Sequence, residues 1–209
     1  MIRKKIGIYL ALIVTTMLMA VLILPVIQKY DEKYLKVHNQ VAWDFKSNMN
    51  YGELFNTENN KLQSLYDMTV KNGADNLKKA ENQISKAEET INQCKLMIDE
   101  DKSLVENQLI QMKESEELLS KIDQKKVHKE TLLSLHDSLI NLLHTYNQAL
   151  DQYEEVLSLE QKIYSALKAE RDLKEIAVII DEVNQSSGEL SGIIKDLNGY
   201  IVSYNELQI

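Results

Sequence analysis

The feature that most constrains this chain is a run from Ala74 to Ser187 that contains neither glycine nor proline. In its first part, apolar residues recur every seven positions and form one row of a heptad, at Leu77, Ile84, Ile91, Ile98, Val105, Met112 and Leu119. The row paired with it is mostly small or polar, at Ala80, Ala87, Cys94, Asp101, Gln108, Ser115 and Ile122. A heptad pattern sustained over this length predicts a long α-helix.

The two rows of this heptad differ in size, and the difference predicts what the helix packs against. Because one row is large and apolar and the other is small or polar, two copies of the helix could not form a tight, uniform zipper. Packing against other helices of the same chain is the better interpretation. At about 1.5 Å per residue, the helix from Leu77 to Ile122 would be about 70 Å long, which predicts a rod.

Composition and charge favour an all-α protein and disfavour one class of partner. The 209 residues include six glycines and one proline, and helix is the state that tolerates their scarcity best, so we expect almost no strand. The formal net charge is −8, and the body is more acidic still without the N-terminal cations. Such a surface repels phosphates, so we expect no nucleic-acid partner. The single cysteine, Cys94, cannot form an internal disulfide, and its place in the heptad indicates a buried residue rather than a reactive thiol.

Residues 1–29 are interpreted as a short cytoplasmic tail followed by a transmembrane signal anchor. Residues 6–27 are uncharged and long enough to cross a hydrocarbon core of about 30 Å. The end of this run has no A-x-A pattern, which favours an uncleaved anchor; a cleaved signal peptide is the alternative. Three cations at residues 3–5 adjoin the span, although three lysines also follow it closely. Because the first group is contiguous, we expect the rest of the chain to be extracytoplasmic.

Two shorter helices are predicted between the anchor and the long heptad. Residues 30–50 carry apolar and aromatic side chains at steps of three or four, and Gly52 either bends or breaks this helix. A second helical stretch starts near Leu54 and ends in an Asn-Gly pair at residues 72–73, where a reversal of the chain is expected. Asp75 would then cap the next helix.

Two more helices are expected after the long heptad. Residues 123–130 carry only one aliphatic side chain, and the apolar pattern then resumes in a different register over residues 132–167. The change of register indicates a turn or a stutter, and we favour a turn between residues 123 and 131. Asp172 followed by Glu175 is close to a capping box, which predicts that a last helix begins there.

Four segments carry a resemblance to a known family, namely residues 142–150 (LLHTYNQAL), 160–167 (EQKIYSAL), 181–184 (DEVN) and 204–205 (YN). They resemble the YkyA family of cell-wall-binding lipoproteins of Gram-positive bacteria, over roughly residues 50–207. The resemblance implies an all-helical protein that is exported to the cell envelope and binds the wall.

One departure from that family concerns the anchor. Members of the family carry a lipobox cysteine at the end of the signal sequence, whereas Cys94 lies far downstream in the helical body. The resemblance therefore does not imply lipidation of this chain. The uncleaved span at residues 6–27 would anchor it instead, and more firmly than one acyl chain.

The sequence assigns no catalytic, cofactor-binding or metal-ligating residue. None of the histidines has a glutamate three residues before it or a second histidine four residues away, and all are interpreted as solvated: His38, His128, His136 and His144. Neighbouring acids point in different directions on a helix and are interpreted as solvated surface rather than as paired catalytic carboxylates: Glu88-Glu89, Glu114 with Glu116-Glu117, and Glu154-Glu155. For Tyr146, Tyr153 and Tyr164, core packing is favoured over stacking on sugars.

These patterns predict an all-α protein with an N-terminal transmembrane helix, followed in residues 30–209 by an elongated antiparallel bundle of three or four long helices. The predicted function is non-enzymatic: a membrane-anchored cell-envelope protein that binds cell-wall polymer or another envelope protein. No cofactor and no small-molecule substrate are expected. The alternative is a scaffold or accessory subunit of a membrane complex acting through helix-to-helix contacts, which hydrophobic residues on an outward face of the bundle would favour.

The predicted topology can be tested by protease treatment of intact cells. We expect the protease to degrade residues 30–209, because the cations at residues 3–5 hold the N-terminus in the cytoplasm. A body that is protected in intact cells and degraded only after lysis would reverse the orientation.

Overall fold

The fold is all-α throughout the part of the chain that the structure describes. The computed structural model describes residues 30–47, 59–75, 77–122, 128–169 and 172–207, together with Leu54. Residues 30–47 form an N-terminal helix, which is followed by α2 (Asn59–Asp75), α3 (Leu77–Ser120), α4 (His128–Lys168) and α5 (Leu173–Leu207). These ranges contain no strand, so the all-α part of the predicted fold class is confirmed.

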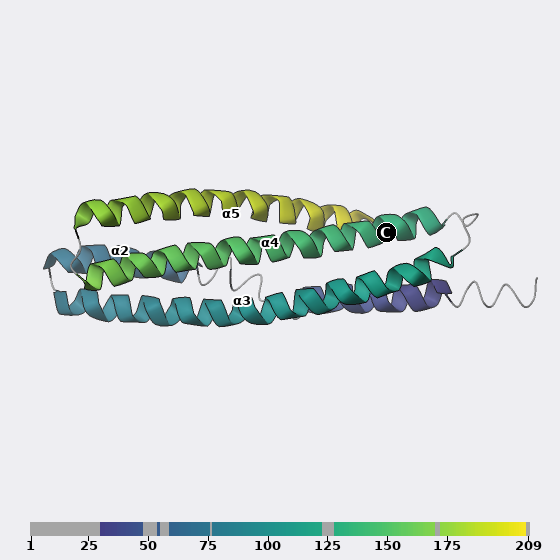
Figure 1. The fold of residues 1–209 in the computed structure, drawn as a ribbon, viewed down its shortest axis with the longest axis horizontal. Helices are drawn as coiled ribbons and strands as arrows, with labels where there is room; N and C mark the ends of the chain where they lie inside the picture. The colour runs from purple at the N-terminus through teal and green to yellow at the C-terminus, as the bar shows by residue number, and fades with distance from the viewer. Residues whose placement is uncertain are drawn as a thin grey trace, which may run out of the picture.

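The helices run along one long axis and form an antiparallel rod (Figure 1). α4 packs against both α3 and α5, and α2 packs against α3. The N-terminal helix lies at the end of the rod where α3 ends and α4 begins, and the hydroxyl of Tyr34 donates a hydrogen bond of 3.4 Å to the carbonyl oxygen of Leu132 there. α2 lies at the opposite end, where Tyr66 packs against the apolar cluster that contains Ile163. The first layer of the bundle is therefore shared by the N-terminal helix and α2; Gly52 lies outside the described residues.

Both rows of the α3 heptad are buried, as predicted. The side chains described in the apolar row are at most 5 % exposed: Ile84, Ile91, Ile98, Val105, Met112 and Leu119. The small and polar row is at most 7 % exposed, and it includes Cys94 and Asp101, each fully inaccessible. Asp101 accepts a hydrogen bond from the hydroxyl of Tyr146 on α4. Tyr146, a large residue of α4, thus packs at the small and polar row of α3.

The predicted turn after the long heptad is confirmed, because α3 and α4 are separate helices. α3 ends at Ser120, and the next two residues continue as a tighter turn, in which the Lys121 amide bonds the Leu118 carbonyl at 3.2 Å. The Lys129 ammonium then donates a hydrogen bond of 2.7 Å to the carbonyl oxygen of Ile122. This bond satisfies a carbonyl that the end of a helix leaves free.

The reversal before α3 lies later in the chain than predicted. α2 continues through residues 72–73 as far as Asp75, and α3 begins at Leu77. Asp75 is therefore the last residue of α2. Its side chain lies outside the described part of the chain, so the predicted cap on the next helix stays a prediction. A glycine in a helix costs only about 1 kcal/mol relative to alanine, and the packing of α2 on α3 outweighs that cost.

The predicted start of the last helix is confirmed at Asp172. Its side-chain oxygen Oδ1 accepts a hydrogen bond of 3.1 Å from the amide of Lys174. Its carbonyl oxygen accepts bonds from the amides of Glu175 and Ile176, at 3.0 and 3.2 Å. Asp172 thus satisfies amides that the first turn of α5 would otherwise leave free.

No helix in the described ranges is long and apolar enough to cross a membrane. The predicted span at residues 6–27, and the tail and anchor assigned to residues 1–29, lie outside the described residues. The membrane anchor therefore stays a prediction.

The packing of α3 predicts that one buried amide weakens the fold. Gln108 is 2 % exposed, and neither polar atom of its amide has a hydrogen-bond partner among the described residues. Replacing it by methionine (Gln108→Met) keeps the length of the side chain and removes this unsatisfied group, so the free energy of unfolding should rise by about 1–3 kcal/mol. Urea unfolding of residues 30–209, followed by circular dichroism, measures this change.

The matched control is the same substitution at Gln111, which is exposed on the same helix. Gln111→Met should change the free energy of unfolding by no more than about 0.5 kcal/mol. An equal effect of both substitutions, or a loss of stability in Gln108→Met, would show that the buried Gln108 amide does not weaken the fold.

Candidate functional site

A pocket of about 150 Å³ opens between α2, α4 and α5, and we call it the three-helix pocket. Its lining is Leu62, Gln63 and Tyr66 from α2, Glu160, Ile163 and Tyr164 from α4, and Ile180, Val183 and Asn184 from α5. Each helix contributes apolar side chains and one further polar group: an amide from α2 and from α5, and a carboxyl group from α4. The pocket therefore combines an apolar interior with a few polar groups, as small-ligand sites commonly do.

Helix periodicity explains why these residues meet. Leu62 and Tyr66 are four residues apart, and so are Glu160 and Tyr164, and this spacing places each pair on one face of its helix. α4 turns this face toward α2 and α5, so Glu160 lies at the meeting point of three helices. The site consequently depends on the packing of α2 against the end of α4.

Glu160 is the carboxyl group of this pocket. Its oxygen Oε2 is buried and has no hydrogen-bond partner within the described part of the chain. Burial raises the pKa of the Glu160 carboxyl from 4.5 to about 7. Charged and neutral forms are therefore present in similar amounts near neutral pH, and the group can respond to a ligand by changing its protonation.

Two tyrosines flank this carboxyl. Tyr164 is 2 % exposed, whereas Tyr66 is half-buried. Burial raises the pKa of the Tyr164 hydroxyl, and the neighbouring Glu160 and Tyr66 raise it further. Tyr164 therefore keeps its proton and presents a hydrogen-bond donor as well as a ring face.

The pocket lies far from the end of the rod where residue 30 is placed. Leu132 contacts Tyr34 at that end, and Ile163 lines the pocket on the same helix, α4. At about 1.5 Å per residue, these two positions are roughly 45 Å apart along α4. A ligand in the pocket would therefore be held well away from the first described residue.

A second buried cluster lies at the residue-30 end and joins three helices through Tyr34, His38, His136 and Tyr204. The rings of Tyr34 and His38 are 5.8 Å apart, those of Tyr34 and His136 5.9 Å, and those of His38 and Tyr204 5.7 Å. The Tyr204 hydroxyl and Nε2 of His38 form a hydrogen bond of 3.2 Å. These contacts fix the N-terminal helix against α4 and α5.

The interpretation of all four histidines as solvated is wrong for two of them. His38 is 1 % exposed and His136 is 4 % exposed, whereas His144 is exposed and the side chain of His128 lies outside the described residues. His38 shares a buried helical face with Tyr34, four residues before it, so its burial follows from the packing of that face. Burial lowers the pKa of both buried imidazoles, so both rings are neutral near neutral pH.

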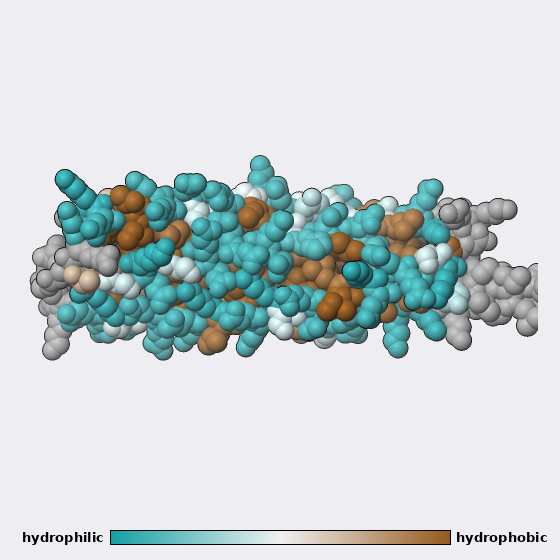
Figure 2. Space-filling model, viewed as in Figure 1, coloured by the Kyte–Doolittle hydropathy of each residue, from teal (hydrophilic) through white to brown (hydrophobic). Residues whose placement is uncertain are grey.

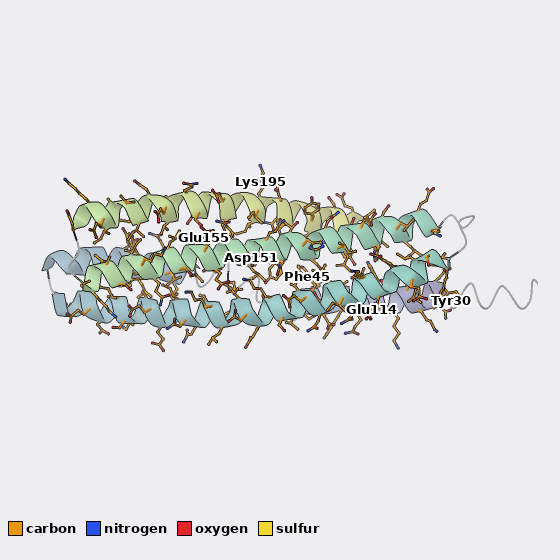
Figure 3. The ribbon with its side chains drawn as sticks, viewed as in Figure 1. Tyr30, Phe45, Glu114, Asp151, Glu155 and Lys195 are labelled. Atoms are coloured by element: carbon orange, nitrogen blue, oxygen red, sulfur yellow. The ribbon has the colours of Figure 1, made fainter. Side chains whose placement is uncertain are left out.

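The acidic residues lie on several faces of the rod, and some of them contact other helices. Lys102 on α3 pairs with Asp151 at 2.8 Å and with Glu154 at 2.6 Å, whereas Glu155 lies beside α5 (Figure 3). Glu88 pairs with Lys168 across α3 and α4. Glu88 and Glu154 thus contribute to helix packing, while most of the other acids are exposed as predicted. No group of three or more potential ligands in the described ranges is arranged to hold a metal.

Comparison with known proteins identifies the family. The family model named YkyA, described as "Putative cell-wall binding lipoprotein", matches residues 30–208. The chain belongs to the YkyA family. No curated protein and no solved structure matches the chain. Two of the segments that resemble YkyA meet at the three-helix pocket: residues 160–167 supply Glu160 and Tyr164, and residues 181–184 supply Asn184.

The sequence alone did not identify the pocket, although it contained part of the signal. Core packing is confirmed for the three tyrosines considered, since Tyr146, Tyr153 and Tyr164 are all nearly inaccessible. Tyr164 also lines the pocket, and Glu160 precedes it by four residues on the same buried face. A carboxylate on an apolar face is unusual, because burying an unpaired charge is costly, and this was the available signal.

The raised pKa of Glu160 predicts how stability changes with pH. The folded chain holds this proton more tightly than the unfolded chain does, since the pKa falls from about 7 to 4.5 on unfolding. The free energy of unfolding should therefore decrease as the pH rises from about 4.5 to about 7, by up to roughly 3 kcal/mol from this group. Glu160→Gln removes the titration and should be more stable than the unsubstituted chain at pH 8.

Urea unfolding of residues 30–209 between pH 5 and pH 8 measures this difference. Glu155→Gln, the same substitution at an exposed position of α4, is the control and should follow the unsubstituted chain. A Glu160→Gln curve parallel to the unsubstituted curve would show that Glu160 is not held in a desolvated site.

Proposed function

We propose that this YkyA-family protein is a non-enzymatic cell-envelope protein that binds cell-wall polymer at the three-helix pocket. The observation that carries the proposal is the position of this pocket within a domain matched by the family over residues 30–208. Two tyrosines, two amides and one carboxyl surround an apolar interior there. Aromatic rings with hydrogen-bonding groups beside them are suited to the mixed apolar and polar surface of a wall polymer.

The direction of the rod supports this proposal. The predicted span at residues 6–27 precedes residue 30, which lies at one end of the bundle. With that end at the membrane, the pocket would be carried roughly 45 Å outward along α4. The rod then acts as a spacer between the membrane and the binding site.

The chemistry of the pocket supports binding rather than catalysis. Glu160 is the single carboxyl group among the residues that line it. Glycoside hydrolysis ordinarily uses two carboxyl groups that face each other across the scissile bond. The described lining does not supply such a pair, and we therefore propose no reaction.

A continuous apolar outer face would favour the alternative function, a scaffold in a membrane complex. The large apolar side chains that are exposed are instead distributed over all of the described helices: Trp43, Met68, Leu96, Ile110, Leu133, Val178, Tyr200 and Val202. The face shown in Figure 2 is mostly hydrophilic, with separate apolar patches. Wall binding therefore remains our first choice.

Co-sedimentation of residues 30–209 with isolated cell walls tests this function. We expect saturable pelleting, and Tyr66→Ser should weaken it by about tenfold, because the substitution removes one ring face from the pocket. Tyr200→Ser, an exposed tyrosine on α5, is the matched control and should pellet normally. Thermal unfolding of each variant verifies that it is folded.

Two results would contradict the proposed function. The first is the absence of pelleting at any salt concentration, with divalent cations present or removed. The second is an equal loss of pelleting in both tyrosine variants, which would show that the pocket is not the binding site.

A further inference from the structure

We propose that the three-helix pocket receives a primary ammonium group on a short aliphatic chain, with Glu160 as its counter-ion. This inference rests on the proposed function in one respect: it takes the ammonium group to be part of a wall polymer. It goes beyond that function by naming the group recognised and the residue that recognises it.

Oε2 of Glu160 is the unsatisfied polar atom of this pocket. Buried polar atoms almost always have a hydrogen-bond partner, and Oε2 of Glu160 has none among the described residues. The pocket lining contains neither lysine nor arginine. A ligand that brings its own charged N–H donor would satisfy this oxygen with a charge-assisted hydrogen bond.

The walls around this carboxyl are aliphatic and aromatic. The apolar side chains Leu62, Ile163 and Val183 would contact the methylene groups of such a ligand. The rings of Tyr66 and Tyr164 line the same pocket, and aromatic faces attract ammonium groups. An ammonium on an aliphatic chain is therefore complementary to the pocket in both charge and polarity.

Size and charge exclude other ligand classes. A pocket of about 150 Å³ can enclose a group of about the size of benzene, so a short alkyl amine fits inside it, whereas a whole disaccharide would extend beyond it. An anionic group would be repelled by Glu160 and by a chain whose formal net charge is −8. A neutral alcohol brings no counter-ion, so it would gain no charge-assisted hydrogen bond from the ionised form of Glu160.

Ligand-observed NMR on the full-length chain in a neutral detergent tests this inference, with n-butylammonium as the probe. We expect saturable binding of butylammonium, and affinities at least tenfold weaker for 1-butanol and for butyrate. The affinity for butylammonium should rise between pH 6 and pH 8, because the pKa of Glu160 is about 7 and the amine remains charged throughout. The other titratable groups that line the pocket are Tyr66 from α2 and Tyr164 from α4, and α5 contributes none.

Two variants distinguish Glu160 from the acidity of the surface. Glu160→Gln should weaken butylammonium binding at least tenfold at pH 8, whereas Glu155→Gln should leave it unchanged. Equal binding of 1-butanol by the unsubstituted chain, or equal binding of butylammonium by both variants, would overturn the inference. The comparison of the three probes needs no variant, so it is decisive even if Glu160→Gln is poorly folded.

Acetylated walls separate this inference from the proposed function. If wall ammonium groups are the ligand, treating isolated walls with acetic anhydride should abolish the pelleting of the full-length chain in detergent. Pelleting that survives acetylation would overturn the ammonium inference and leave wall binding intact. Binding of butylammonium without pelleting on untreated walls would overturn wall binding, and with it the wall as the source of the ammonium.

Discussion

The burial of both rows of the α3 heptad is the constraint on which the rest of the structure depends. One row supplies large aliphatic side chains, and the other supplies small or polar ones, so the second row has to be filled from outside α3. Tyr146 of α4 does this at Asp101, where its hydroxyl donates a hydrogen bond to a fully buried carboxyl group. A second copy of α3 has no large side chains in register with the small and polar row. The two heptad rows therefore favour packing against a helix of the same chain over a symmetric zipper.

This pairing of α3 with α4 has consequences at both ends of the rod. At one end, the N-terminal helix is held by a buried cluster in which Tyr34, His38 and Tyr204 pack their rings. At the other end, α2 covers the last turns of α4 and forms a pocket around Glu160. In the first cluster the Tyr204 hydroxyl and Nε2 of His38 form a hydrogen bond, but neither ring nitrogen of His136 has a hydrogen-bond partner among the described residues. In the second, Oε2 of Glu160 has no such partner either. The two ends therefore differ in what they bring together: aromatic and imidazole rings pack at the first, and a carboxyl group lines a pocket at the second.

The sequence predicted the long helices well because their signals are local. Heptad spacing predicted α3, the end of the heptad pattern after Ile122 predicted the turn, and Asp172 predicted the start of α5. The reversal before α3 was predicted too early, because an Asn-Gly pair permits the end of a helix without requiring it. Burial of His38 and the pocket around Glu160 depend on which faces meet across helices that are distant in sequence. Spacing within one helix determines a face but does not identify its neighbour, which is why these features required the structure.

The central claim is that wall polymer is bound at the pocket end of the rod and not along its whole surface. The most direct test is to place a photoreactive amino acid at Gln63, which is exposed and lines the pocket, or at Glu114, which is exposed near the opposite end (Figure 3). Irradiation of living cells that carry the full-length protein would then be followed by a search for wall fragments attached to it. The account predicts attachment from position 63 and none from position 114. Equal attachment from both positions, or attachment from position 114 alone, would contradict it.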